Sequence, residues 1–167
     1  MYYTMSHGLA LIFDLGGVVF RYSAHELDML RNNNLHKSPF VPIEHMVTLI
    51  KRCRAQVDKA GVRRHQLYIL SNFNRASFEV LKRFHAPILD LFDGYVIAGQ
   101  VGYAKPDQRI YEHLLDKYGL RASACVFVDD EKEKVAAACA VGMSGVVCDT
   151  VTTVEQAFAE HGVFKLE

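Results

Sequence analysis

Several features that define other classes of protein are missing from this sequence of 167 residues. No run approaches the ~18 apolar residues that a membrane-spanning helix needs. Met1 to Gly8 lack the basic segment of a signal peptide. The 19 basic side chains only equal the 19 acidic ones, so the basic excess typical of nucleic-acid-binding proteins is missing too. We therefore expect a cytoplasmic protein with neither a membrane nor a nucleic acid as partner.

Cysteine is scarce and is not spaced for metal or disulfide chemistry. The chain has four cysteines and no C-x-x-C pair, and three of the four lie inside apolar stretches. This pattern indicates small buried thiols in a reducing compartment. The glycine-rich motifs G-x-G-x-x-G and G-x-x-x-x-G-K-[ST] are also missing, so the sequence gives no support for dinucleotide binding or P-loop chemistry.

Short apolar runs alternate with amphipathic stretches along the whole chain. Runs of this length, apolar on both faces, are typical of strands in a covered parallel sheet, and they fall at residues 9–13, 67–70, 95–97, 125–128 and 144–148. Helical periodicity falls between them, at residues 43–59, 75–84, 106–118, 132–141 and 154–161. The alternation predicts an α/β fold, a three-layer sandwich around a parallel, Rossmann-like five-stranded sheet, in one domain over residues 1–167.

Polar residues follow four of the five expected strands. In chain order they are Asp14, then Ser71 with Asn72, then Lys105 a little downstream of its strand, then Asp129 with Asp130. Ligands of open α/β sheets bind beyond the carboxyl ends of the strands, so we expect these side chains to form one site.

The chemistry of this group indicates phosphoryl transfer. Three carboxylates at one sheet edge would repel each other and raise each other's pKa unless a cation lay among them, and an oxygen-only ligand set favours Mg²⁺. Ser71 and Asn72 would donate hydrogen bonds to phosphoryl oxygens. Lys105 would hold both the phosphate and Asp14. An acidic nucleophile, a hydroxyl, a lysine and a Mg²⁺ site together predict an aspartyl-phosphate mechanism.

Four segments resemble, in order, the motifs of the haloacid dehalogenase (HAD) superfamily and especially of its phosphatases. They are residues 11–19 around Asp14, 68–72, 102–107 and 126–130. The resemblance implies that Asp14 is the nucleophile and a metal ligand, that Ser71 binds phosphate and that Lys105 is the catalytic lysine. It further implies a Mg²⁺ site completed by Asp129, Asp130 and the carbonyl of Gly16.

The chain departs from the family pattern at Gly16. The family's phosphatases usually carry there a second Asp, which acts as general acid and then as base. General acid–base help is worth ~10²- to 10⁴-fold, so we expect reduced turnover of poor leaving groups and a gain from Gly16→Asp. Two alternatives stay open: a catalytically inactive HAD-like binding module, or pseudo-phosphatase, and, more distantly, a dehalogenase-like hydrolase.

Two further departures concern the surroundings of the site. The family often has an acidic residue three positions after the second Asp of the pair, followed by Asn. This chain has Glu133 and Lys134 there. We expect Glu133 to be an outer carboxylate of the site, and Lys134 to be either a further cation at the site or a solvated lysine. The cap domain of most relatives is reduced to a short, minimal helical insert at residues 21–41. So small an insert leaves an open site, which suits a large phosphorylated substrate or coverage by a protein partner.

Overall fold

A parallel five-stranded sheet forms the centre of the molecule. The computed structural model describes residues 8–22 and 37–164. The strands lie in the order β5-β4-β1-β6-β7, and every neighbouring pair is parallel. Their bounds are β1 (Ala10–Phe13), β4 (Gln66–Ser71), β5 (Gly94–Ile97), β6 (Cys125–Asp129) and β7 (Ser144–Val147). The predicted α/β fold with five parallel strands is confirmed.

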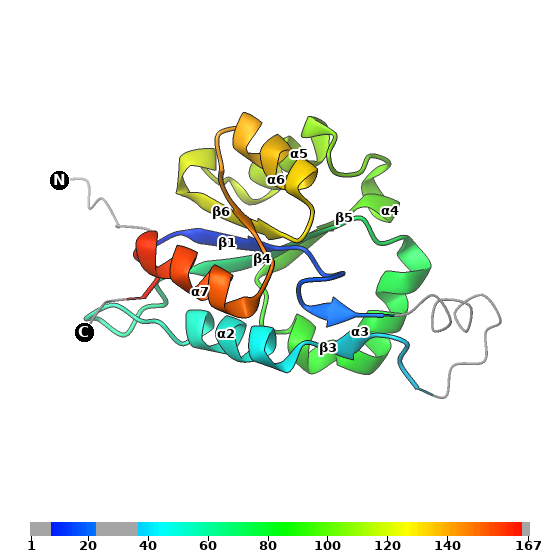
Figure 1. Cartoon of the computed structure of the whole chain (residues 1–167), viewed down its shortest axis with the longest axis horizontal. Helices are drawn as coiled ribbons and strands as arrows, with labels where there is room; N and C mark the ends of the chain where they lie inside the picture. Colours follow the sequence, from blue (N-terminus) through cyan, green and yellow to red (C-terminus); the bar gives the residue numbers. More distant parts are fainter. Residues whose placement is uncertain (1–7, 23–36, 165–167) are drawn as a thin grey trace.

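Helices cover both faces of the sheet and complete the three layers (Figure 1). One face packs against α2 (Glu44–Arg54), α3 (Arg75–Leu89) and α7 (Val151–Glu160). The other packs against α5 (Gln108–Tyr118) and α6 (Lys132–Ala140). Strand β1 alternates between these two cores: Leu11 and Phe13 belong to the first, and Ala10 and Ile12 to the second. Burial on both faces explains why this strand has no polar positions.

Several helix boundaries differ from the sequence prediction, and α7 (Val151–Glu160), for example, begins three residues before the predicted start at 154. Helix α2 ends at Arg54, before the predicted end at residue 59. Helix α3 continues to Leu89, across a non-helical His85 and through Pro87, so it is longer than predicted. Helix α5 begins after an Asp107 cap, so Pro106 precedes the helix. The predicted C-cap of α5 is confirmed, because Gly119 adopts the left-handed conformation there.

Two elements near the carboxyl ends of the strands were not predicted. A small antiparallel ribbon joins β2 (Phe20–Arg21) to β3 (Val41–Pro42), with Arg21 opposite Val41. A short helix, α4 (Ala98–Val101), follows β5. Most of the predicted cap remnant at 21–41 lies outside the described residues, and only its two ends are described, one of them carrying Tyr22.

A buried histidine, His65, links backbone segments at the amino-terminal end of β1. The His65 Nδ1 atom accepts a hydrogen bond of 3.2 Å from the backbone N–H of Leu9, just before β1. Its Nε2 atom lies 3.0 Å from the carbonyl of Val163, after α7. These partners require a neutral ring with its proton on Nε2. Burial favours this form and lowers the pKa of His65.

Candidate active site

The register of the central strands brings the first and fourth motifs together. Phe13 of β1 pairs with Ile69 of β4 on one side and with Val128 of β6 on the other. The ladder continues one residue further, because the N–H of Asp14 donates a 2.9 Å hydrogen bond to the carbonyl of Val128. Asp14 and Asp129 therefore leave adjacent strands at the same level.

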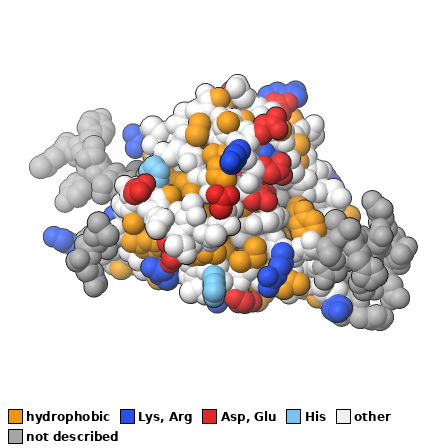
Figure 2. Space-filling model, viewed as in Figure 1, with side chains coloured by type: hydrophobic (Ala, Val, Ile, Leu, Met, Phe, Trp, Pro, Cys, Tyr) orange, Lys and Arg blue, Asp and Glu red, His pale blue; other side chains and the backbone are white. Residues whose placement is uncertain are grey.

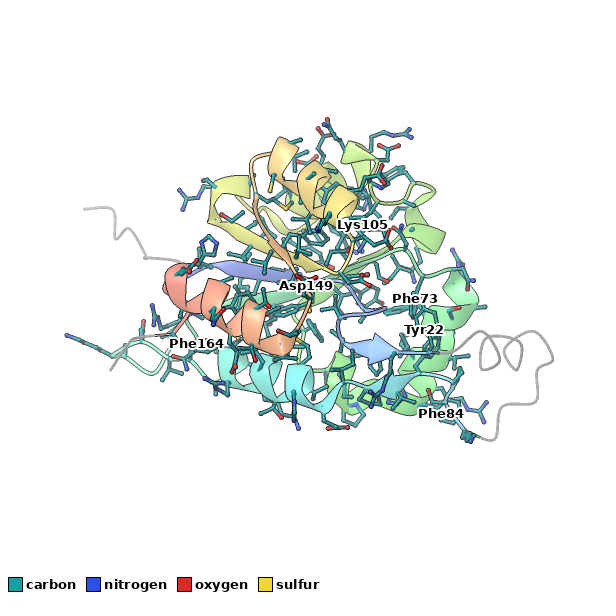
Figure 3. All side chains as sticks on the ribbon, viewed as in Figure 1. Tyr22, Phe73, Phe84, Lys105, Asp149 and Phe164 are labelled. Carbon is teal, nitrogen blue, oxygen red and sulfur yellow. The ribbon has the colours of Figure 1, made fainter. Side chains whose placement is uncertain are left out.

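The ammonium group of Lys105 forms ion pairs with both of these carboxylates. Its Nζ atom lies 2.9 Å from Oδ1 of Asp14 and 2.6 Å from Oδ2 of Asp129, and it donates a third hydrogen bond, of 2.8 Å, to the carbonyl of Leu70. The lysine side chain is completely buried. Figure 3 shows it among the side chains between the sheet and helices α5 and α6. One ammonium group thus fixes the orientation of both carboxylates.

Asn72, expected as a phosphate ligand, lines the cavity and also binds the backbone of Lys105. Its Nδ2 donates to the carbonyl of Lys105 at 2.8 Å, and its Oδ1 accepts from the N–H of the same residue at 2.8 Å. The amide thereby grips both backbone groups of Lys105 and holds the lysine loop against the end of β4. Ser71, the last residue of that strand, is completely buried, and its hydroxyl accepts a 3.4 Å contact from the N–H of Phe73.

The three predicted carboxylates form one acidic cluster. Asp14, Asp129 and Asp130 each place one oxygen within 4.8 Å of the others. Burial is the main cause that raises the pKa of Asp14, the charge of Asp129 adds to it, and Lys105 opposes it. Burial and the neighbouring Asp129 likewise raise the pKa of Asp130. The cluster carries more negative charge than one lysine balances, and its hard oxygen donors fit Mg²⁺.

Gly17, the third residue after Asp14, is required because Asp130 lies too close for any side chain at this position. Gly17 has a φ of +79°, and a Cβ atom there would lie 2.2 Å from Oδ2 of Asp130. Its N–H closes the turn by donating to the carbonyl of Phe20 at 2.8 Å. A side chain at this position would both strain the turn and push Asp130 out of the cluster.

Two aromatic rings fill the space beside Gly16. A Cβ atom at position 16 would lie 3.0 and 3.1 Å from Cε1 and Oη of Tyr22, and 3.2 Å from Cε1 of Phe73. These contacts are tighter than most Cβ contacts, so a side chain at position 16 requires the rings of Tyr22 and Phe73 to shift by a few tenths of an ångström. The gain in turnover expected for Gly16→Asp stays a prediction, and the new side chain would share its space with these two rings.

A cavity of about 340 Å³ opens above the cluster. The predicted residues on its wall are Asp14, Gly16, Ser71, Asn72, Asp130 and Lys134, and Gly17, Arg21, Tyr22, Phe73 and Glu131 complete it. Lys105 and Asp129 are buried and do not line the cavity. Glu133, expected as the outer carboxylate, is exposed and lies off this wall, which instead holds Glu131, the ion-pair partner of Lys134. No sequence motif marks Tyr22 or Phe73.

Comparison with known proteins decides the family. The haloacid dehalogenase-like hydrolase family matches residues 35–142. The chain belongs to this family. The HAD fold is also seen in a HAD family enzyme from Bacteroides thetaiotaomicron, solved with magnesium and inorganic phosphate, at a TM-score of 0.66 and 14% identity over 84% of this chain and 93% of that one. A dehalogenase with an intermediate complex gives a TM-score of 0.63 at 15% identity, over 85% of each chain.

Two curated fungal proteins are more similar in sequence to this HAD chain. The sesquiterpene phosphatase astK of Aspergillus oryzae is 35% identical over 113 residues, which are 67% of this chain and 54% of that protein. The drimenol cyclase drtB of Aspergillus calidoustus is 34% identical over 82 residues, 49% of this chain and 15% of that protein. The chain thus spans about half, or less, of these relatives. Among residues 8–22 and 37–164, no helix is long and apolar enough to cross a membrane.

Proposed function

We propose that the protein is a Mg²⁺-dependent phosphohydrolase that acts through an aspartyl-phosphate on Asp14. The observation that carries the proposal is the buried arrangement of Asp14, Lys105 and Asp129, with Asp130 completing the acidic cluster. A nucleophilic carboxylate, a fixed lysine and hard oxygen ligands are the parts that this chemistry needs. The name of the A. oryzae relative, a sesquiterpene phosphatase, supports the same reaction class.

The reaction divides into two displacements at phosphorus. A carboxylate oxygen of Asp14 attacks the phosphorus, the ester P–O bond breaks, and its electron pair leaves with the alcohol oxygen, which takes a proton from water. Water then attacks the aspartyl-phosphate, and inorganic phosphate and the free carboxylate result. Lys105 holds the nucleophile in position throughout, and the hydroxyl of Ser71 binds a phosphoryl oxygen. Mg²⁺, held by the cluster and the carbonyl of Gly16, would neutralise the phosphate charge.

The glycine at position 16 shapes the expected kinetics. No carboxyl group stands two residues after Asp14 to protonate the leaving group, so esters of acidic alcohols should react best. General acid–base catalysis, where it is present, typically increases the rate ~10²- to 10⁴-fold. By analogy with the relative, a sesquiterpenyl phosphate such as farnesyl phosphate is the first candidate substrate after an aryl ester. A large phosphorylated molecule, including a protein partner that covers the open side, also fits a reduced cap.

The deciding experiment is hydrolysis of p-nitrophenyl phosphate with Mg²⁺ and with EDTA. This leaving group needs little protonation, so the assay tests the nucleophile and the metal site alone. We expect Mg²⁺-dependent turnover that Asp14→Asn abolishes. Asp149→Asn serves as the matched control, since Asp149 is an exposed carboxylate outside the acidic cluster. Equal, background rates for the wild type and Asp14→Asn, with Mg²⁺ binding intact, would favour the inactive binding module.

A further inference from the structure

Three aromatic side chains form a continuous wall beside the nucleophile. The Tyr22 ring centroid lies 5.8 Å from that of Phe40 and 5.9 Å from that of Phe73, both edge-on, and Phe40 lies 5.2 Å from Phe73. We call these three rings the aromatic wall. Tyr22 directly follows β2 and Phe40 directly precedes β3, so the small ribbon brings these two rings together. Phe73 follows Ser71 and Asn72 at the end of β4.

Two members of the wall line the cavity, and one of them, Phe73, also packs against the core. Phe40 is almost completely buried and supports the others, whereas Tyr22 is 41% exposed and Phe73 is half-buried. Both of these lie on the cavity surface with Asp14 and Ser71. Figure 3 shows Tyr22 and Phe73 next to each other, on the side of the sheet end where the ribbon lies.

The place of the wall identifies the part of the substrate that it meets. In the family's phosphatases, the side chain two residues after the nucleophile reaches the leaving-group oxygen. Here Gly16 has no side chain, and the rings of Tyr22 and Phe73 come within 3.0–3.2 Å of where its Cβ atom would be. The rings therefore lie on the leaving-group side of Asp14. They come this close to the backbone because Gly16 has no Cβ atom.

Polarity divides the cavity into two parts. Asp14, Asp130, Glu131 and Lys134 make one part charged and suited to the phosphate and its metal. The rings of Tyr22 and Phe73 give the other part an apolar surface, which is bordered by Arg21 and by the Tyr22 hydroxyl. Figure 2 shows apolar side chains at the surface beside the acidic ones near the middle of the face in view.

We propose that the aromatic wall binds the alcohol part of the substrate and selects phosphate monoesters of apolar alcohols. This inference rests on the proposed phosphohydrolase function and names its substrate class. An apolar chain against Tyr22 and Phe73 leaves water, and each buried methylene favours binding by about fourfold. Selectivity then arises in the core domain itself, from residues on either side of the ribbon and after β4.

A homologous series of n-alkyl phosphates tests the proposal. We expect kcat/KM with Mg²⁺ to rise about fourfold per methylene from ethyl to hexyl phosphate. Tyr22→Ser and Phe73→Ser should flatten this rise to about twofold or less per methylene. Tyr22→Phe keeps the ring and should keep the rise. Val62→Ser is the matched control, because Val62 is an exposed apolar residue outside the cavity, and its series should match the wild type.

Non-hydrolysable alkyl phosphonates separate this inference from the proposed function. Their affinities, measured by calorimetry with Mg²⁺, should rise with chain length in the wild type and much less in Tyr22→Ser. Asp14-dependent turnover with no dependence on chain length would overturn the aromatic-wall inference and leave the phosphohydrolase standing. Chain-length-dependent binding without any turnover would overturn the phosphohydrolase and support the wall as a binding site. Equal affinities for all phosphonates would overturn the wall even in an inactive protein.

Discussion

Replacing Lys105 by Met is expected to destabilise the metal-free protein strongly. The ammonium group is completely buried and lies 2.9 Å from Asp14 and 2.6 Å from Asp129. Methionine fills a similar volume but leaves two buried carboxylates facing each other without a cation. Removing one partner of a buried ion pair typically costs 3–5 kcal/mol, and here two partners are left. We expect about 4 kcal/mol, which corresponds to a decrease in Tm of about 10 °C for a domain of this size.

The matched control is an ion pair of equal length at the surface. Lys82 lies 2.6 Å from Glu79, the same separation as in the buried pair with Asp129, but its side chain is 39% exposed. Exposed pairs contribute about 0–1 kcal/mol, so Lys82→Met should change Tm by no more than about 3 °C. Thermal unfolding of both variants, followed by circular dichroism at pH 7 in EDTA, measures the contrast between burial and exposure at constant geometry.

The pH dependence of Lys105→Met has a defined sign. Without the lysine, the pKa of Asp14, already raised by burial, rises further in the folded protein only. The folded state then binds the proton more tightly than the unfolded state, so stability is lost above the folded pKa and returns as pH falls through it. The loss of unfolding free energy in Lys105→Met, relative to the wild type, should therefore become smaller at acidic pH. Two results would refute this reasoning: a loss of unfolding free energy in Lys105→Met that is within about 1 kcal/mol of the loss in Lys82→Met at pH 7, or a loss that does not change with pH.

Three further predictions concern other contacts. The pKa of His65 is lowered from its ordinary value of 6.5, so stability should fall as pH decreases below about 6.5, and His65→Gln should show a smaller pH slope in urea unfolding. Gly17→Ala should weaken Mg²⁺ binding at least tenfold by calorimetry, because its Cβ atom would displace Asp130, and unchanged affinity would contradict the contact. Asn72→Ala should lower kcat on p-nitrophenyl phosphate about tenfold through a looser Lys105, and KM should change less; the reverse pattern would indicate a direct phosphate ligand.

The fold was largely predictable because burial on both faces leaves a clear pattern. Strands such as β1 and β6 are short runs without polar residues, each ending at an aspartate, and the structure places them side by side at the centre of the sheet. Helix boundaries were less predictable. Helix α3 runs through Pro87 to Leu89, since contacts with the core hold a segment that local propensity would have ended.

The convergence of Asp14 and Asp129 followed from their places at strand ends, and that of Lys105 from its place shortly downstream of β5. The roles of their neighbours did not. The Asn72 amide could donate a hydrogen bond to phosphate, which is what its sequence position predicts. Only the three-dimensional path of the loop before Pro106 shows that this amide also binds the backbone of Lys105. Tyr22 lies far from the motifs, and its place depends on the pairing of β2 with β3 and on the absence of a Cβ atom at Gly16. Such close approaches are properties of three-dimensional packing, and no local pattern encodes them.

The single imidazole of His65 has a consequence for the connectivity of the chain. It bonds the backbone before β1 on one nitrogen and the backbone after α7 on the other, so Leu9 and Val163 lie within one side chain of each other. This junction is at the sheet edge opposite Asp14. A circular permutant that joins the two segments with a short linker, and opens the chain in an exposed loop such as that around Gly61, should keep the arrangement of Asp14, Lys105 and Asp129.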